Sequence, residues 1–249
     1  SSLSTGLRNT ATGYGSLQKQ TTACNNTASG YRAARCTTTG SGNAAFGKEA
    51  LLVNTTGCFN TAVGTCALQS NTTAPYNVAF GACALFNNAT GENNTSVGYQ
   101  SLKTNTSSND NTALGYFSMV SNTTGTGNTA VGSYSLDANS TGNYNTAVGN
   151  HALSATSTGA NNVGVGQAAL FYQTSGDDNT AVGRDAMHFL TTASANTGIG
   201  RYALFNNTTG ASGTAVGRGA LQSNSTGHRN VAVGRDCLLS NTTADNNTA

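Results

Sequence analysis

The chain has 249 residues, of which only 8% are charged, with a net charge of +2 and a single proline. So small a positive charge argues against a nucleic-acid-binding surface, and no stretch approaches the roughly 18 consecutive apolar residues of a membrane-spanning helix. Low charge with few bulky apolar residues would fit a disordered chain, but a strict internal period argues against disorder.

That period is set by glycine, which recurs every 17 residues without insertion or deletion. The recurring glycines are Gly13, Gly30, Gly47, Gly64, Gly81, Gly98, Gly115, Gly132, Gly149, Gly166, Gly183, Gly200, Gly217 and Gly234. A fixed short period is typical of a solenoid, whose repeats bury their apolar side only against neighbouring repeats. The sequence therefore predicts an all-β parallel β-solenoid over residues 1–249, with about 14 to 15 coils of 17 residues. Both ends fall within a coil, so we expect a single continuous array that is uncapped at either end.

Residues at the same place in successive coils are called a column. The place four residues before the glycine holds asparagine in nearly every coil. This column consists of Asn9, Asn26, Asn43, Asn60, Asn77, Asn94, Asn111, Asn128, Asn145, Asn162, Asn179, Asn196 and Asn230, with Gly213 as the exception. Stacked coils would place these side chains about 4.8 Å apart, within reach of amide hydrogen bonds along the stack. Asparagine also suits backbone conformations with positive φ. We expect a structural asparagine ladder.

The next three places read Thr-Ala-Val in the typical coil, as in Thr61, Ala62 and Val63. Alternation with period 2 and β-branched residues predict a short strand. We expect the columns of Val63 and Leu68 to form the core, joined by the Thr61 column. The Ala62 and Ala67 columns accept only small residues, which indicates either close packing by a second layer or chain, or a thin coil with tight bends.

The residue after the glycine is arginine in four successive coils: Arg184, Arg201, Arg218 and Arg235. Like charges at strand spacing repel, so this column is a candidate docking edge. Its alternative is a solvated turn edge. The neighbouring Asp185 and Asp236 are expected to point elsewhere, and in the first half of the chain tyrosine fills the column (Tyr14, Tyr31, Tyr99, Tyr116).

Seven residues after the glycine, asparagine forms the N-glycosylation sequon in nine coils. The candidate acceptors are Asn54, Asn71, Asn88, Asn105, Asn122, Asn139, Asn207, Asn224 and Asn241. In the context of an exported protein these would carry glycans on one turn. However, the hydroxyl residue of the sequon occurs even where the asparagine does not, as at Thr39 and Thr158. The hydroxyl therefore has its own structural reason, in a turn bond or a threonine ladder.

Six cysteines favour an oxidising compartment. Cys66 and Cys83 share a column in adjacent coils, at a spacing that allows a disulfide. Cys36 lies one coil from both Cys24 and Cys58 and could pair with either. Free, buried thiols are the alternative.

No catalytic constellation is visible. The histidines His151, His188 and His228 fall at three different places in the coil, and the acids are scattered. We therefore expect no enzyme activity, no cofactor and no metal site.

The string Asn60-Thr61-Ala62-Val63-Gly64, followed by Ala67-Leu68, resembles the head repeats of trimeric autotransporter adhesins and similar repeats in phage and viral tail-fibre or surface-fibre proteins. The resemblance covers the whole chain and implies a left-handed parallel β-roll, although the 17-residue coil is longer than the family's.

The residues and the resemblance together favour a structural shaft of an extracellular fibre, filament or appendage, on a cell or virion surface. Its expected partners are further copies of itself, end to end and side by side, together with covalent glycans. One alternative is an adhesin that binds cell-surface glycans through Phe171, Tyr172 and Phe205. Ice binding is weaker, because the adjacent threonines beside the turn cannot both face one flat surface.

Overall fold

The computed structural model describes residues 5–249, and this range contains no helix and hence none long and apolar enough to cross a membrane. The chain divides into two compact units, Ser1–Thr126 and Gly127–Ala249. Both are built from three-residue strands joined by loops and turns. The strands of the first unit are β1 (Thr10–Thr12), β2 (Thr27–Ser29), β3 (Ala44–Phe46), β4 (Thr61–Val63), β5 (Val78–Phe80), β6 (Thr95–Val97) and β7 (Thr112–Leu114). Those of the second are β8 (Thr129–Val131), β9 (Thr146–Val148), β10 (Val163–Val165), β11 (Thr180–Val182), β12 (Thr197–Ile199), β13 (Thr214–Val216) and β14 (Val231–Val233).

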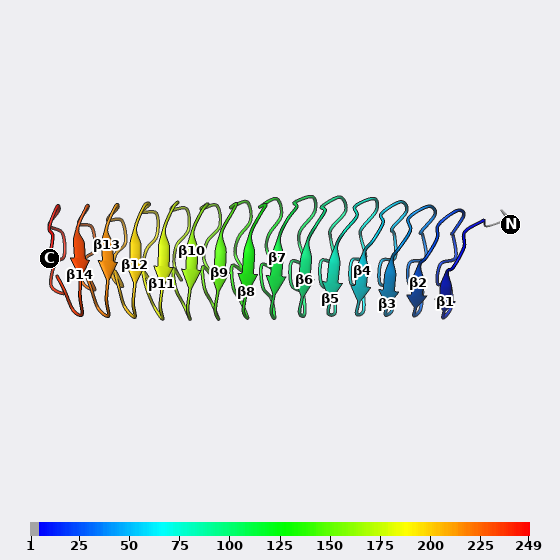
Figure 1. Ribbon diagram of the computed structural model, residues 1–249, viewed down its shortest axis with the longest axis horizontal. Coiled ribbons are helices and arrows are strands. Elements are labelled where there is room, and N and C mark those ends of the chain that lie inside the picture. Colours follow the sequence, from blue (N-terminus) through cyan, green and yellow to red (C-terminus); the bar gives the residue numbers. More distant parts are fainter. Residues whose placement is uncertain (1–4) are drawn as a thin grey trace. The chain divides into compact units, whose positions relative to one another are not determined.

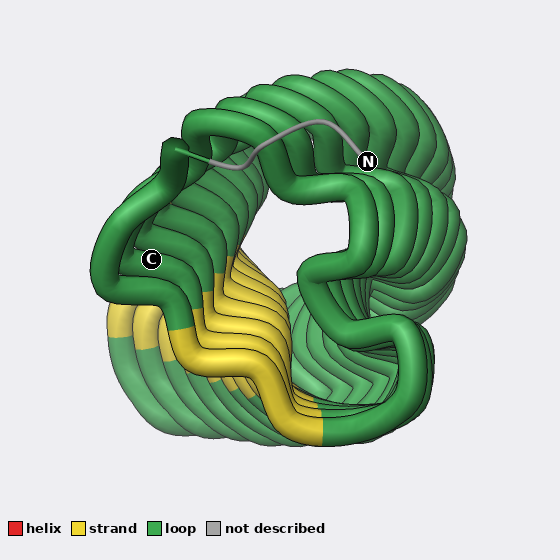
Figure 2. Tube along the Cα trace, turned by 90° about the vertical axis from the view of Figure 1, so that its right-hand side faces the viewer, coloured by secondary structure: helices red, strands yellow, loops and turns green. Residues whose placement is uncertain are grey.

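Within each unit, successive strands pair in parallel and in one constant register (Figure 1). In the first unit Thr61 lies opposite Val78, and in the second Thr180 lies opposite Thr197. Each 17-residue repeat therefore forms one coil, with the strand on one side and loops around the remainder (Figure 2). The predicted parallel β-solenoid is confirmed, with about 13 coils.

The recurring glycine is required both by its backbone angle and by the closeness of the next coil. Gly64 has a φ of +131°, which residues with a Cβ rarely adopt. A Cβ at this position would lie 2.5 Å from the carbonyl oxygen of Gly81. The N–H of Gly64 donates to the carbonyl oxygen of Phe46 at 2.8 Å. The period thus marks a place where any side chain would force adjacent coils apart.

The core differs from the predicted one. Leu68 is fully buried as expected, but so is Ala62, whereas Val63 is only half-buried. In the same column as Val63, the Val148 side chain is 36% exposed. The prediction that the Val63 column and the Thr61 column belong to the core is therefore wrong. Successive side chains of a strand point to opposite faces, so an inward alanine turns both of its neighbours outward.

Available space explains which strand residue faces inward. Where the Ala62 column holds glycine, a Cβ on Gly198 would approach Met187 Cε to 2.9 Å, and one on Gly164 would approach Leu153 Cγ to 3.1 Å. The interior opposite the strand is already filled by the buried leucine and methionine column. Of the two explanations for the small-residue columns, the narrow coil holds, because these residues are covered from within their own unit.

The predicted asparagine ladder is present. The backbone N–H and the Nδ2 of Asn60 both donate to Oδ1 of Asn43, at 2.9 and 3.2 Å. Asn60 Nδ2 also donates to the carbonyl oxygen of Ala74 at 2.9 Å. Buried amides need such partners, because an unpaired polar group in the interior is destabilising. Each asparagine therefore ties its own coil to both neighbours.

Besides the recurring glycine, three places in each coil adopt the left-handed backbone, mostly with residues other than glycine, which the sequence did not predict. In one stretch these are Phe59, Cys66 and Leu68, with φ of 57°, 58° and 49°. Each such residue costs on the order of 1 kcal/mol. Hydrogen bonds to adjacent coils hold the conformation, as when the Leu68 N–H donates to the carbonyl oxygen of Ala84 at 3.0 Å. The asparagine expected at positive φ, Asn60, instead directly follows a left-handed residue.

Candidate functional site

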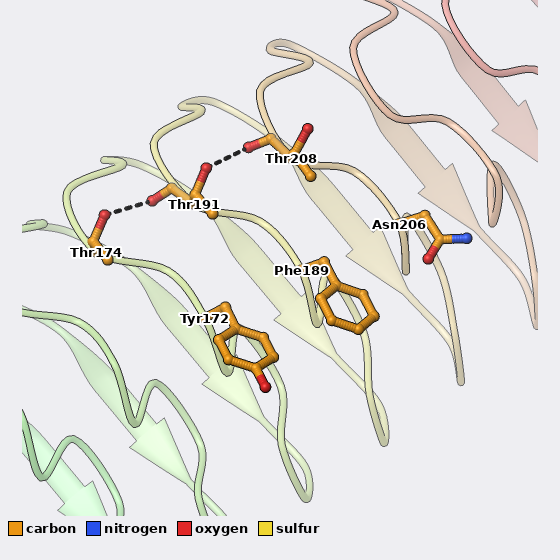
Figure 3. Close-up of a pocket in the computed structure, with 6 residues that line it drawn as sticks. All are labelled: Tyr172, Thr174, Phe189, Thr191, Asn206 and Thr208. Atoms are coloured by element: carbon orange, nitrogen blue, oxygen red, sulfur yellow. Dashed lines mark hydrogen bonds between the residues drawn. The ribbon is translucent and has the colours of Figure 1, made fainter.

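An open groove of about 660 Å³ crosses three successive coils of the second unit (Figure 3). Its lining residues are Tyr172, Phe189 and Asn206 on one side, and Thr174, Thr191 and Thr208 on the other. The first three stand six places after the coil glycine, and the others stand eight places after it. The residues between them point inward, as the fully buried Gln173 shows. Alternation along the chain thus turns both columns to the same surface.

Two interlocked rows of rings form the aromatic side of this groove. Tyr172 and Phe189 stack with centroids 5.4 Å apart and planes 7° apart. Behind them His188 stacks between Phe171 and Phe205, at 5.2 and 5.3 Å. The rows meet edge to face, with Phe189 and Phe205 centroids 5.1 Å apart. The structure brings together the three aromatic residues predicted from the sequence, although Phe171 and Phe205 are half-buried while Tyr172 is exposed.

The opposite side of the groove is a row of hydroxyl oxygens. Thr174 Oγ1 donates to the carbonyl oxygen of Thr191 at 3.2 Å, and Thr191 Oγ1 donates to that of Thr208 at 3.1 Å (Figure 3). A hydroxyl that has donated its single proton can still accept hydrogen bonds. The outer aromatic row ends at Asn206, which has no ring to stack on Phe189 (Figure 3). The groove therefore combines an apolar ring surface with a line of acceptors.

The groove threonines bear on the expectation that the sequon hydroxyl belongs to a threonine ladder. A threonine ladder exists, but it uses the residue directly after the asparagine, as in Thr55 Oγ1 donating to the carbonyl oxygen of Thr72 at 3.0 Å. The sequon hydroxyl one place later, such as that of Thr56 or Thr73, is exposed. The adjacent threonines thus do not present a paired flat array.

The candidate glycosylation column lies in the interior. Apart from the half-buried Asn241, all of its asparagines are buried. Asn71 Nδ2 donates to Asn54 Oδ1 and to the carbonyl oxygen of Ala74, both at 3.0 Å. A glycan would need this nitrogen to face solvent. The predicted glycan-bearing turn is therefore contradicted by the folded coil, and the sequon column is a second amide ladder that the sequence analysis missed.

The predicted disulfides are also absent. All six cysteines are free, including Cys66 and Cys83, and burial raises the pKa of the Cys66 thiol. Cys58 Sγ accepts from the Ser41 N–H at 3.3 Å and donates to the carbonyl oxygen of Thr56 at 3.4 Å. The Ser41 hydroxyl makes the equivalent bonds in its own coil. Ser41 Oγ donates to the carbonyl oxygen of Thr39 and accepts from the Cys24 N–H at 2.9 Å. A cysteine in this column acts as a local hydrogen-bonding group.

The four arginines form one column, but they are not equivalent. Arg184 pairs with Asp185 and Arg235 pairs with Asp236, each at 3.2 Å. The expectation that these acids point elsewhere is wrong. Both aspartates have left-handed backbones, with φ of 55° and 56°, so the alternation of an extended strand does not apply at this place in the coil.

Arg201 and Arg218, in the middle of the column, have no carboxylate partner within residues 5–249. The Arg201 guanidinium lies 4.4 Å from the Tyr202 ring centroid and donates to the Tyr202 hydroxyl at 2.8 Å. Arg184 donates to the same hydroxyl at 3.1 Å. These two hydrogen bonds, that of Arg201 first, lower the pKa of Tyr202. Tyr202 thus holds two guanidinium groups together.

Within residues 5–249 no group of three or more His, Cys, Asp or Glu side chains is placed to hold a metal ion. His188 lies 3.5 Å from Asp185, whereas His151 stacks on Tyr134 at 5.0 Å.

In the tyrosine part of the arginine column, Tyr14 stacks on Tyr31 at 5.7 Å.

A scan against models of known protein families and a search of curated proteins both found no match.

Proposed function

We propose that this chain is a structural shaft segment of an extracellular fibre, filament or appendage. The observation that carries the proposal is that most coils contact both neighbouring coils in the same way, through two buried amide ladders. Asn60 represents one ladder and Asn71 the other. Contacts that repeat along one direction suit a body that bears load along that direction and grows by adding coils. Self-association of copies belongs to this proposal.

The test exploits the period. Negative-stain images of the purified protein should show filaments. Duplicating residues 61–94, two whole coils, should preserve filaments and the β-rich spectrum, because each asparagine still meets its neighbour. The matched control duplicates residues 61–86, one and a half coils, and should disrupt both because it places unlike columns against each other. The shaft proposal fails if the protein remains as short discrete particles while binding one glycan tightly.

A second function, glycan binding, is favoured by the groove of the second unit. An apolar ring surface with a few fixed polar groups is the usual composition of a small-ligand site, and ring faces suit the C–H surface of a sugar while the Thr174 and Thr191 oxygens suit its hydroxyl donors. On a glycan array, Phe189→Ala should weaken binding about tenfold, equivalent to about 1.4 kcal/mol.

The matched control for this test is Phe59→Ala. Phe59 is also exposed and stacks on Tyr76 at 5.6 Å, but it belongs to the first unit. Equal losses in the two variants, or no loss in either, would contradict a glycan site at the groove.

A further inference from the structure

Two neighbouring arginines in the arginine column of the second unit have no carboxylate partner among residues 5–249. Of the four stacked arginines, the outer two are paired with aspartates, and Arg201 and Arg218 remain. Both are exposed, and they stand in adjacent coils at a strand spacing of about 4.8 Å. Like charges in the same column of adjacent coils repel, and an anion lying between the two guanidinium groups would offset the repulsion.

The arginine pair is connected to the aromatic groove by consecutive ring contacts. Arg201 covers Tyr202, whose ring meets Phe205 with centroids 5.1 Å apart. Phe205 in turn meets Phe189, which lines the groove, at 5.1 Å. Cationic groups, ring surfaces and threonine oxygens therefore form one continuous surface within the second unit.

We propose that this surface binds an acidic polysaccharide, with a carboxylate or sulfate of the chain lying across Arg201 and Arg218. The sugar rings next to that anion extend over Phe205 and Phe189 towards the threonine row. Guanidinium groups match the planar geometry of carboxylates and also bind sulfate through several donors. The inference rests on the second proposed function, glycan binding, and adds the charge of the ligand.

The threonine row favours a polysaccharide over a nucleic acid, which also combines anions with ring stacking. Thr174, Thr191 and Thr208 each donate their proton to a backbone carbonyl oxygen. They therefore present acceptors to the groove, which pair with sugar hydroxyls. Phosphate oxygens are acceptors as well and would find no donor there.

The test compares polysaccharides that share a backbone and differ in charge. Wild-type protein is titrated with polygalacturonate and its methyl ester, and with dextran sulfate and dextran. We expect about tenfold tighter binding of the charged member in at least one pair. The pair that shows the preference identifies carboxylate or sulfate as the anion.

The variant Arg201→Gln/Arg218→Gln should lose this preference and keep its binding of the neutral member. The control Lys48→Gln/Lys103→Gln removes the same charge from the first unit and should change neither. Circular dichroism establishes that both variants are folded. A fall in neutral binding after Phe189→Ala reports on the glycan site separately from the arginines.

Three outcomes overturn the proposal. Equal affinity for the charged and neutral members refutes the role of the arginines but leaves the glycan site standing. Absence of binding to all four polysaccharides refutes both. Tighter, arginine-dependent binding of a single-stranded oligonucleotide than of any polysaccharide would assign the surface to nucleic acid.

Discussion

The asparagine ladder of the second unit has one natural defect, which allows a sharp test of its energetic role. Gly213 occupies the ladder place between Asn196 and Asn230. The Gly213 N–H donates to Asn196 Oδ1 at 2.8 Å, as in other coils. With no side chain, however, Gly213 provides no Oδ1 for the buried N–H of Asn230. The ladder is therefore interrupted for one step.

Gly213→Asn should repair it. Gly213 does not have a positive φ, and a Cβ there would lie 3.1 Å from Asn196 Oδ1, an atom to which the new amide can donate, and 3.7 Å from Leu204. An acceptor for a buried N–H is worth about 1–3 kcal/mol, and replacing glycine at an unstrained place adds about 0.4–1 kcal/mol. Allowing for the rotamer entropy of the new side chain, the free energy of unfolding should rise by about 2–3 kcal/mol.

Thermal unfolding and hydrogen exchange at the Asn230 amide measure this effect. The melting temperature should rise by about 5–10 °C, and exchange at Asn230 should slow. Gly213→Ala is the control, because it supplies the backbone contribution without the amide and should raise stability by at most about 1 kcal/mol. If the alanine and asparagine variants are equally stable, or if exchange at Asn230 does not change, the side-chain amide at this place does not stabilise the coil.

Three further predictions concern the core, the thiols and a half-buried carboxyl group. In urea denaturation, Leu153→Ala should lower the free energy of unfolding by about 3–5 kcal/mol, because Leu153 is fully buried. Val148→Asp should lower it by less than about 1 kcal/mol, as expected for a partly exposed site. The reverse order would show that the valine column belongs to the core after all. Adding a reductant should leave the melting temperature unchanged because no disulfide is present, and a fall would reveal one. Burial raises the pKa of Asp137 above its ordinary value of 3.8, and its hydrogen bond from Ser154 only partly opposes this. The ionised form is thus disfavoured in the folded state, so the free energy of unfolding should fall as the pH rises above 3.8. Asp137→Asn should remove this fall from the plot of unfolding free energy against pH. An unchanged plot would exclude Asp137 as the cause.

The parts of the fold that were predictable are those in which one residue type has one physical reason. Glycine at position 64 is explained by its backbone angle and by the 2.5 Å that would separate a Cβ there from the carbonyl oxygen of Gly81, and either reason alone would select glycine. The Asn60 side chain donates through Nδ2 to Asn43 Oδ1 and accepts through Oδ1 from the Asn77 N–H, which asparagine can do in one side chain. A strict period in such residues indicates stacking before any strand is assigned.

The groove and the arginine pairing were less accessible because they depend on how the backbone turns between strands. Tyr172 was predicted as an exposed aromatic residue, but Phe189 was missed, and Asn206 is ordinary in the sequence and matters only because it ends the stacked row. The pairing of Arg184 with Asp185 at 3.2 Å follows from a left-handed residue that neither composition nor alternation indicates. Non-glycine residues tolerate this backbone here because bonds to both adjacent coils compensate for its strain.

The error in assigning the core shows which signal to read in a narrow solenoid. Hydrophobicity pointed to Val63, yet that column accepts Phe80 and Leu114, whose side chains are exposed by 54% and 44%. The Ala62 column tolerates almost no change in size, and a Cβ on Gly198 would already meet Met187 at 2.9 Å. In a wide core, apolar area drives burial and large residues mark the inside. In a 17-residue coil the opposite side fills the available volume, so the inward strand position is marked by the absence of size variation.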